Sequence, residues 1–120
     1  MPSSSQSSLN PEYLRMVRDH YAQAKEDFFV RNGTAHWVPP HIMRGMDRYV
    51  LMRVQPGSFL TAVLENDMKG AVLNADEQAL TNLHAVVIFV VNVLPADIQG
   101  SQDKVNAWLA GGNDATSNGT

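Results

Sequence analysis

Three side chains that can bind an anion follow Val38-Pro39-Pro40 at intervals of three and four residues: His41, Arg44 and Arg48. At roughly 100° per residue, an α-helix places all three on one stripe. The apolar side chains of the same segment fall on the opposite side, so we expect the stripe to face solvent. A guanidinium offers a planar fork of donors that matches phosphate oxygens. The pattern therefore predicts a helix face that binds phosphate or nucleic acid.

Other residues are candidates for extending this face. Arg31 and Arg53 end predicted helices, and Trp37 precedes the prolines, where an aromatic ring can stack on bases or wedge between them. Gly45 falls on the stripe and would let a backbone or ligand approach closely. Two alternatives remain open. The arginines can be an ordinary solvated face in which Asp47 pairs with one of them, and Trp37 can be a lid packed on the core.

The sequence gives little indication of an enzyme. It has no cysteine, no Gly-rich phosphate loop, and no two of its four histidines have the i, i+4 spacing that places two metal ligands on one helix face. Glu65 and Asp67 are two residues apart and would point away from each other on a helix. Asp76 and Glu77 suit the first turn of a helix, where they favour its dipole. We therefore predict a non-enzymatic protein without a cofactor or a metal.

Helical periodicity predicts the elements that position these residues. Apolar side chains recur at three and four positions over residues 11–32, with Asn10 as a candidate N-cap and Asn32-Gly33 as a stop. Pro40 can open a second helix over residues 40–54. After the break at Gln55-Pro56-Gly57, Ser58 can cap a third helix that continues to about residue 72.

A fourth helix is expected over residues 75–94, ended by Pro95. Its centre, residues 86–91, is β-branched and alone would be typical of a buried strand, but a helix start at Asp76 leads directly into it. Because this helix is apolar nearly all round, it is either the central core helix or the seam of a homodimer. Ser101 can cap a last short helix that stops at Gly111-Gly112. The fold class is all-α, a single compact domain of about five helices.

The composition sets the limits of this domain. Residues 1–9 are Ser-rich and residues 111–120 consist largely of Gly, Asn, Ser and Thr, so we expect disordered tails around a helical domain at residues 10–110. The formal net charge is −3, but residues 1–60 hold seven basic and five acidic residues, whereas residues 61–120 hold two and seven. With no visible signal peptide and no apolar run of the roughly 20 residues that a bilayer requires, we expect a soluble protein.

The second and third predicted helices, with the turn between them, have the outline of a helix-turn-helix pair. The third helix exposes Glu65 and Asp67, which phosphates would repel. If the protein binds DNA, the second helix is therefore the better candidate for the contact.

From Trp37 to Leu109, about 60% of the chain, the sequence resembles a family of small uncharacterised proteins encoded by tailed phages and prophages. The resemblance rests on Val38-Pro39-Pro40, Arg48-Tyr49, Gln55-Pro56-Gly57-Ser58-Phe59-Leu60-Thr61-Ala62-Val63-Leu64, Asn66-Asp67, Ala75-Asp76, Asn92 with Pro95, and Gly100-Ser101 followed by Val105 and Trp108-Leu109. It implies a phage origin, a place in the cytoplasm of the infected bacterial host and an accessory role. It implies no particular functional residues.

Two functional hypotheses follow. The first is a phage accessory protein that binds double-stranded DNA, mainly through phosphate contacts from Arg44, Arg48 and His41, with help from Arg31, Arg53 and Trp37. The alternative is a protein–protein inhibitor or adaptor that acts on a host polymerase or defence system. It would use the apolar fourth helix or the acidic second half: Glu65, Asp67, Asp76 and Glu77. Capture of a small nucleotide is a third possibility and requires a pocket.

Overall fold

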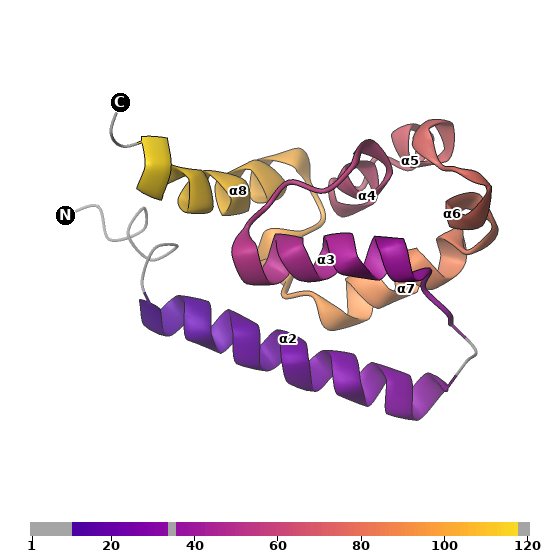
Figure 1. Cartoon of the computed structure of the whole chain (residues 1–120), viewed down its shortest axis with the longest axis horizontal. Coiled ribbons are helices and arrows are strands. Elements are labelled where there is room, and N and C mark those ends of the chain that lie inside the picture. The colour runs from indigo at the N-terminus through magenta and orange to yellow at the C-terminus, as the bar shows by residue number, and fades with distance from the viewer. Residues whose placement is uncertain (1–10, 34–35, 118–120) are drawn as a thin grey trace.

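The computed structural model describes residues 11–33 and 36–117 of the 120-residue chain, with side chains up to residue 110. All regular secondary structure in these residues is helical, which confirms the predicted class. Figure 1 shows a long helix, α2, lying along one side of a body built from the shorter helices. None of the described helices is long and apolar enough to cross a membrane.

Helix α2 spans Pro11–Asn32, as predicted. It ends where Gly33 adopts a φ of 57° and donates its N–H to the carbonyl of Phe29 at 2.9 Å, because glycine occupies this left-handed region without strain. The proposed N-cap at Asn10 lies outside the described residues. Tyr21 and Phe28 pack edge to face on Phe89, so α2 is held to the body by aromatic contacts.

Helix α3 spans Pro40–Met52 and carries the predicted anion-binding stripe. It starts at the predicted proline and ends two residues earlier than expected, because Arg53 adopts a left-handed conformation with a φ of 56°. Its inner face buries Ile42, Met46, Tyr49 and Val50. Burial of this face leaves the opposite side of α3 in solvent.

The predicted third helix is two helices, α4 (Ser58–Leu64) and α5 (Met68–Asn74). Asn66 breaks the run with a φ of 65°, and the Asp67 carboxylate caps α5 by accepting the N–H of Gly70 at 3.0 Å. Asparagine and aspartate favour such local conformations. Ser58 is not the cap that we predicted: it is the first residue of α4, and Gly57 holds the N-cap position.

The predicted fourth helix is also divided, into α6 (Glu77–Thr81) and α7 (Leu83–Val93), with Asn82 between them. Asp76 caps α6 by accepting the N–H of Ala79 at 2.7 Å. Because of this break, each of the two helices buries a different face. Helix α6 buries Ala79, and α7 buries five residues: Ala85, Val86, Phe89, Val90 and Val93. α7 is therefore the core helix, the first of the two roles that the sequence left open.

After Pro95, a short 3-10 helix, η1 (Ala96–Ile98), leads to α8 (Gln102–Ser117). Ser101 caps α8 as predicted, since its Oγ accepts the N–H of Lys104 at 3.2 Å. The predicted stop at Gly111-Gly112 is wrong, because α8 continues through both glycines. A glycine inside a helix costs only about 1 kcal/mol relative to alanine, so it weakens a helix without ending it.

Candidate anion-binding face

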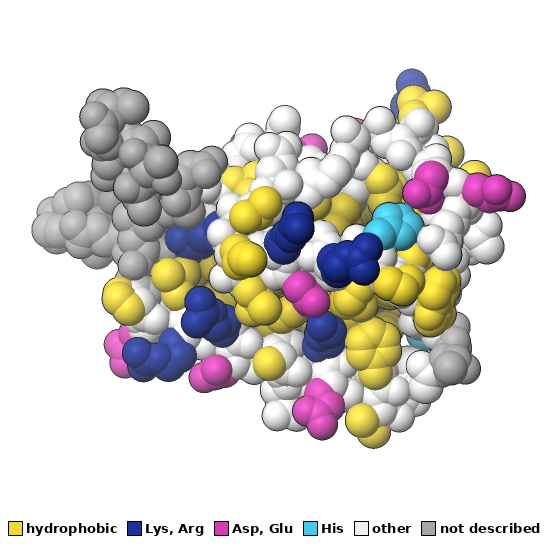
Figure 2. All heavy atoms as spheres, viewed as in Figure 1, with side chains coloured by type: hydrophobic (Ala, Val, Ile, Leu, Met, Phe, Trp, Pro, Cys, Tyr) yellow, Lys and Arg dark blue, Asp and Glu magenta, His cyan; other side chains and the backbone are white. Residues whose placement is uncertain are grey.

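The exposed side of α3 carries His41, Arg44 and Arg48, and we call these three residues the basic ridge. Figure 2 shows Lys, Arg and His side chains in a row over α3, with Asp and Glu side chains nearby. The predicted stripe is therefore present on the surface. Its capacity to bind an anion depends on whether neighbouring carboxylates already neutralise it.

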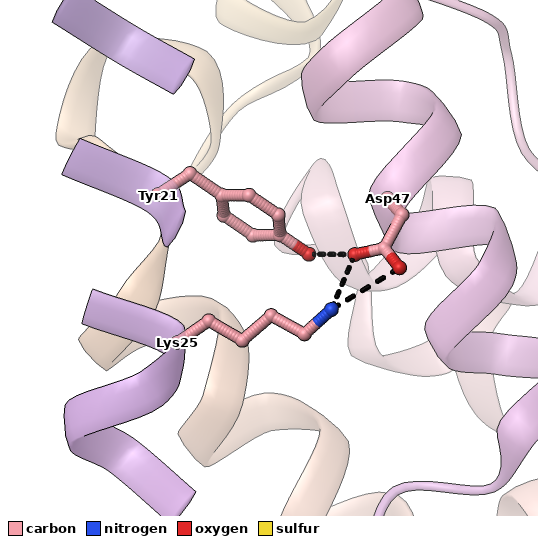
Figure 3. Close-up of polar contacts among 3 residues, drawn as sticks. All are labelled: Tyr21, Lys25 and Asp47. Carbon is pink, nitrogen blue, oxygen red and sulfur yellow. Dashed lines mark hydrogen bonds and ion pairs between the residues drawn. The ribbon is translucent and has the colours of Figure 1, made fainter. Parts of the chain in front are cut away.

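Asp47, the sole acidic residue of α3, is paired with α2 rather than with the ridge (Figure 3). Its carboxylate lies 2.9 and 3.2 Å from the Lys25 ammonium, and it accepts the hydroxyl of Tyr21 at 2.5 Å. Burial, and then this hydrogen bond and the charge of Asp47, raises the pKa of Tyr21. Within the described residues, neither Arg44 nor Arg48 has an ion-pair partner. Asp47 therefore does not neutralise Arg44 or Arg48, contrary to the alternative that the sequence left open.

One end of the ridge meets the acidic half of the chain. His41 Nε2 lies 3.3 Å from the Asp76 carboxylate, which also caps α6. The contact is an ion pair only when His41 is protonated. The permanent positive charge of the ridge therefore belongs to Arg44 and Arg48.

Arg53 does not extend this face. It is 9% exposed, and its guanidinium carbon lies 4.0 Å from the centre of the Trp108 ring. Burial lowers the pKa of Arg53. The Trp108 indole N–H donates to the Tyr49 carbonyl at 2.7 Å, so this cluster joins the end of α3 to α8. The sequence makes Arg53 a candidate because it ends the predicted second helix, but the left-handed turn at that residue directs its side chain into the contact with Trp108.

Gly45 faces the Pro-Gly turn and the start of α4. A Cβ atom built on it would lie 3.4 Å from Leu60 Cδ2 and 3.8 Å from Pro56 Cβ. Both distances are ordinary van der Waals contacts, so the packing of α3 against the start of α4 does not require a glycine at this position.

The two remaining candidates lie outside the ridge. Arg31 is exposed in the last turn of α2. Trp37 is 44% exposed, whereas Val38 and Pro39 directly after it are buried. Among the described residues, neither has a polar or ring contact with the ridge. The structure therefore brings together three of the six predicted residues, with Trp37 half-exposed before the start of α3.

Two grooves flank the ridge, and no pattern in the sequence indicates either of them. Between α2 and α3 lies a groove of about 550 Å³, which we call the α2–α3 groove and which includes Lys25, Asp47 and the apolar side chains of Phe29, Val30 and Leu51. On the other side of α3 lies a groove of about 390 Å³ against α4 and α6, which we call the His41 groove. Grooves arise from elements that are distant in sequence, so periodicity within one element does not reveal them.

Folding also brings together two histidines from segments that are distant in the sequence. The rings of His36 and His84 lie 5.4 Å apart between their centres, on the loop before α3 and at the start of α7. Within the described residues, no group of three or more His, Cys, Asp or Glu side chains is placed to hold a metal ion. The pair is therefore a ring contact in this structure.

Comparison of the chain with protein families, with curated proteins and with solved structures finds no match. The functional interpretation therefore rests on the geometry and charge of the ridge and of the grooves beside it.

Proposed function

We propose that this protein is a non-enzymatic phage accessory protein that binds DNA in the cytoplasm of the infected host, mainly through phosphate contacts from the basic ridge. The observation that carries the proposal is that Arg44 and Arg48 are exposed without an ion-pair partner among the described residues, while Lys25 and Tyr21 hold Asp47. The fold thus keeps the one carboxylate of α3 occupied. The resemblance to phage proteins supports the proposed location.

The spacing of the ridge suits a phosphate backbone. Four residues of α-helix advance about 6 Å, and successive phosphates of one DNA strand are about 3.4 Å apart along the duplex axis. Arg44 and Arg48 can therefore contact one or two neighbouring phosphates. Phosphate contacts position a protein without reading sequence, so we expect weak sequence preference and a dissociation constant of roughly 10⁻⁴–10⁻⁶ M, typical of non-specific binding.

The acidic half of the chain limits how DNA can approach. Asp67, Asp76 and Glu77 lie at the starts of α5 and α6 and are exposed. A duplex that lay across them would be repelled, so we expect DNA to contact the exposed side of α3. A recognition role for α4, the second helix of the helix-turn-helix-like pair, would bring DNA towards this acidic surface and is not proposed.

The test is a titration of labelled duplex DNA at two salt concentrations, comparing the parent chain with Arg44→Ala/Arg48→Ala. Each lost phosphate contact should reduce the slope of log affinity against log salt by about 1. Arg15→Ala/Arg18→Ala is the matched control, because it removes the same charge from exposed positions on α2. The proposal fails if the ridge variant binds as well as the parent, or if the control loses as much affinity as the ridge variant.

A second candidate is a protein–protein inhibitor or adaptor of a host polymerase or defence system. The observation that favours it is the apolar surface of α5 and α6 beside the acidic residues, where Leu73 is 74% exposed and Leu80 is 50% exposed. A pull-down from host lysate treated with nuclease, repeated with Leu73→Lys, tests it. Capture of a defined protein that the variant loses would favour this function over DNA binding.

A homodimer through α7 is a further proposal about partners. Most of α7 is buried within the chain, and Val91 is its large exposed hydrophobic residue. Sedimentation at two concentrations, with Val91→Lys as the variant, tests whether the helix also joins two copies.

A further inference from the structure

The His41 groove is a cavity next to the basic ridge. Its volume of about 390 Å³ falls within the range of small-molecule sites, roughly 300–1,000 Å³. Helix α3 contributes His41, Ile42 and Gly45 to its wall, and the start of α4, the end of α5 and the start of α6 close the other sides. His41 thus belongs both to the ridge and to the groove.

The groove combines an apolar floor with polar groups at its edge. Ile42, Leu60 and Ala79 are buried and form apolar surface. Ser58 and Asn74 line the groove and are exposed. The Asn74 amide nitrogen donates to the Gly70 carbonyl at 2.8 Å within α5, which leaves the amide oxygen as an acceptor. An apolar floor with a few acceptors at the edge suits a flat heterocycle that carries N–H groups.

Charge divides this region into two parts. Arg44 is three residues after His41, so their Cβ atoms are about 5–6 Å apart on the helix. Arg48 is three residues after Gly45, about one helical turn from the groove. Asp76 lines the groove itself. A phosphate is therefore attracted to the ridge and repelled from the groove, whereas the amino and imino groups of a base are suited to a carboxylate acceptor.

We infer that the His41 groove binds the base of a nucleotide, guanine being the best match, while Arg44 and Arg48 bind its phosphate. The inference rests on the phosphate contacts of the proposed function and adds a base site to them. The nucleotide can be free or can be an unpaired residue of a nucleic-acid strand, because both present the same base and phosphate. A fully paired duplex keeps its bases stacked and does not fill the groove.

The experiment is a titration of the ¹⁵N-labelled chain with guanosine 5′-monophosphate, guanosine and ribose 5-phosphate, followed by NMR. The monophosphate is expected to bind more tightly than either fragment and to shift amide signals on both sides of the groove, at Gly45 and Ser58. Equal affinity for guanosine monophosphate and ribose 5-phosphate would overturn the inference, because the base would then contribute nothing.

Two asparagines provide a matched pair of variants. Asn74 and Asn92 are both exposed, and each donates its amide nitrogen to the carbonyl four residues earlier at 2.8 Å. Only Asn74 lines the groove. Asn74→Leu is expected to weaken binding of the monophosphate by about fivefold, the value of one hydrogen bond, whereas Asn92→Leu leaves it unchanged. Equal effects of the two variants would contradict the site.

Two further measurements distinguish a free nucleotide from a nucleic-acid strand as the ligand, and distinguish failure of the base site from failure of the proposed DNA binding. A short single strand that contains one guanine should bind more tightly than the free monophosphate if the natural ligand is a strand, and no more tightly if it is a free nucleotide. Duplex binding without monophosphate binding would refute the base site and leave the proposed function standing. Monophosphate binding without duplex binding would refute the proposed function and leave the base site.

Discussion

Raising the pH above 10 is expected to unfold this protein through its buried tyrosines. Tyr21 is 1% exposed and Tyr49 is 0% exposed. Tyr21 donates its hydroxyl to Asp47, and Tyr49 donates its hydroxyl to the Ile98 carbonyl at 2.7 Å. Burial raises the pKa of both phenols, and the negative charges of Asp47 and Glu65 respectively raise it further.

The sign and size of the effect follow from proton linkage. In the unfolded chain each tyrosine releases its proton near pH 10, whereas the folded chain retains it. The stabilisation from each tyrosine is therefore complete below pH 10 and is lost progressively as the pH rises towards the folded pKa. The loss is about 1.4 kcal/mol per pH unit for each group, or about 5.5 kcal/mol for two groups by pH 12. Domains are typically stable by about 5–15 kcal/mol, so a loss of this size can unfold one of modest stability.

The assay is an alkaline titration followed at once by tyrosinate absorbance and by far-ultraviolet circular dichroism. The two signals are expected to change together, because Tyr21 and Tyr49 ionise only when the helices open. Tyr13, whose pKa is raised to about 12 by burial and by its hydrogen bond to Asp97, should ionise late as well. Ionisation of all three tyrosines near pH 10 with an unchanged helical signal would refute the reasoning.

Tyr49→Phe provides a quantitative control for this prediction. It removes one of the two fully buried phenols, so the pH dependence of the unfolding free energy between pH 11 and 12 should fall by about 1.4 kcal/mol per pH unit. Denaturant unfolding at each pH measures that slope. An unchanged slope would mean that Tyr49 does not retain its proton in the folded state.

Asp76→Ala is expected to destabilise the fold by about 1 kcal/mol, because it removes the cap of α6. The same variant is expected to bind duplex DNA more tightly, because it removes the carboxylate 3.3 Å from His41. Asp67→Ala, which removes the corresponding cap of α5, should lower the thermal midpoint without improving binding. Asn66→Ala is expected to lower the thermal midpoint through about 1 kcal/mol of left-handed strain, which Asn66→Gly avoids. Trp108→Phe removes the indole donor of the Tyr49 carbonyl, which still accepts the Arg53 N–H at 3.1 Å, and should cost about 1 kcal/mol in denaturant unfolding, so an unchanged midpoint would contradict the indole hydrogen bond.

Local patterns in the sequence determined several features correctly. Helix α2 has the predicted apolar periodicity and glycine stop, and α3 starts at Pro40 as predicted. The predicted stripe is exposed on α3 at His41, Arg44 and Arg48. These features depend on residues within a few positions of one another, where periodicity, proline and glycine act directly. The breaks at Asn66 and Asn82 were missed because the apolar periodicity continues across them.

Only the tertiary structure decided which side chains belong to the basic ridge and what neutralises them. Lys25 is 22 residues from Asp47 and nevertheless pairs with it, which leaves Arg44 and Arg48 without a carboxylate partner among the described residues. Arg53 leaves the surface to pack on Trp108, from the other end of the chain. The sequence alone therefore determined the positive stripe on α3. Its charge balance and its grooves depend on contacts between distant segments, because electrostatic attraction and packing act through space rather than along the chain.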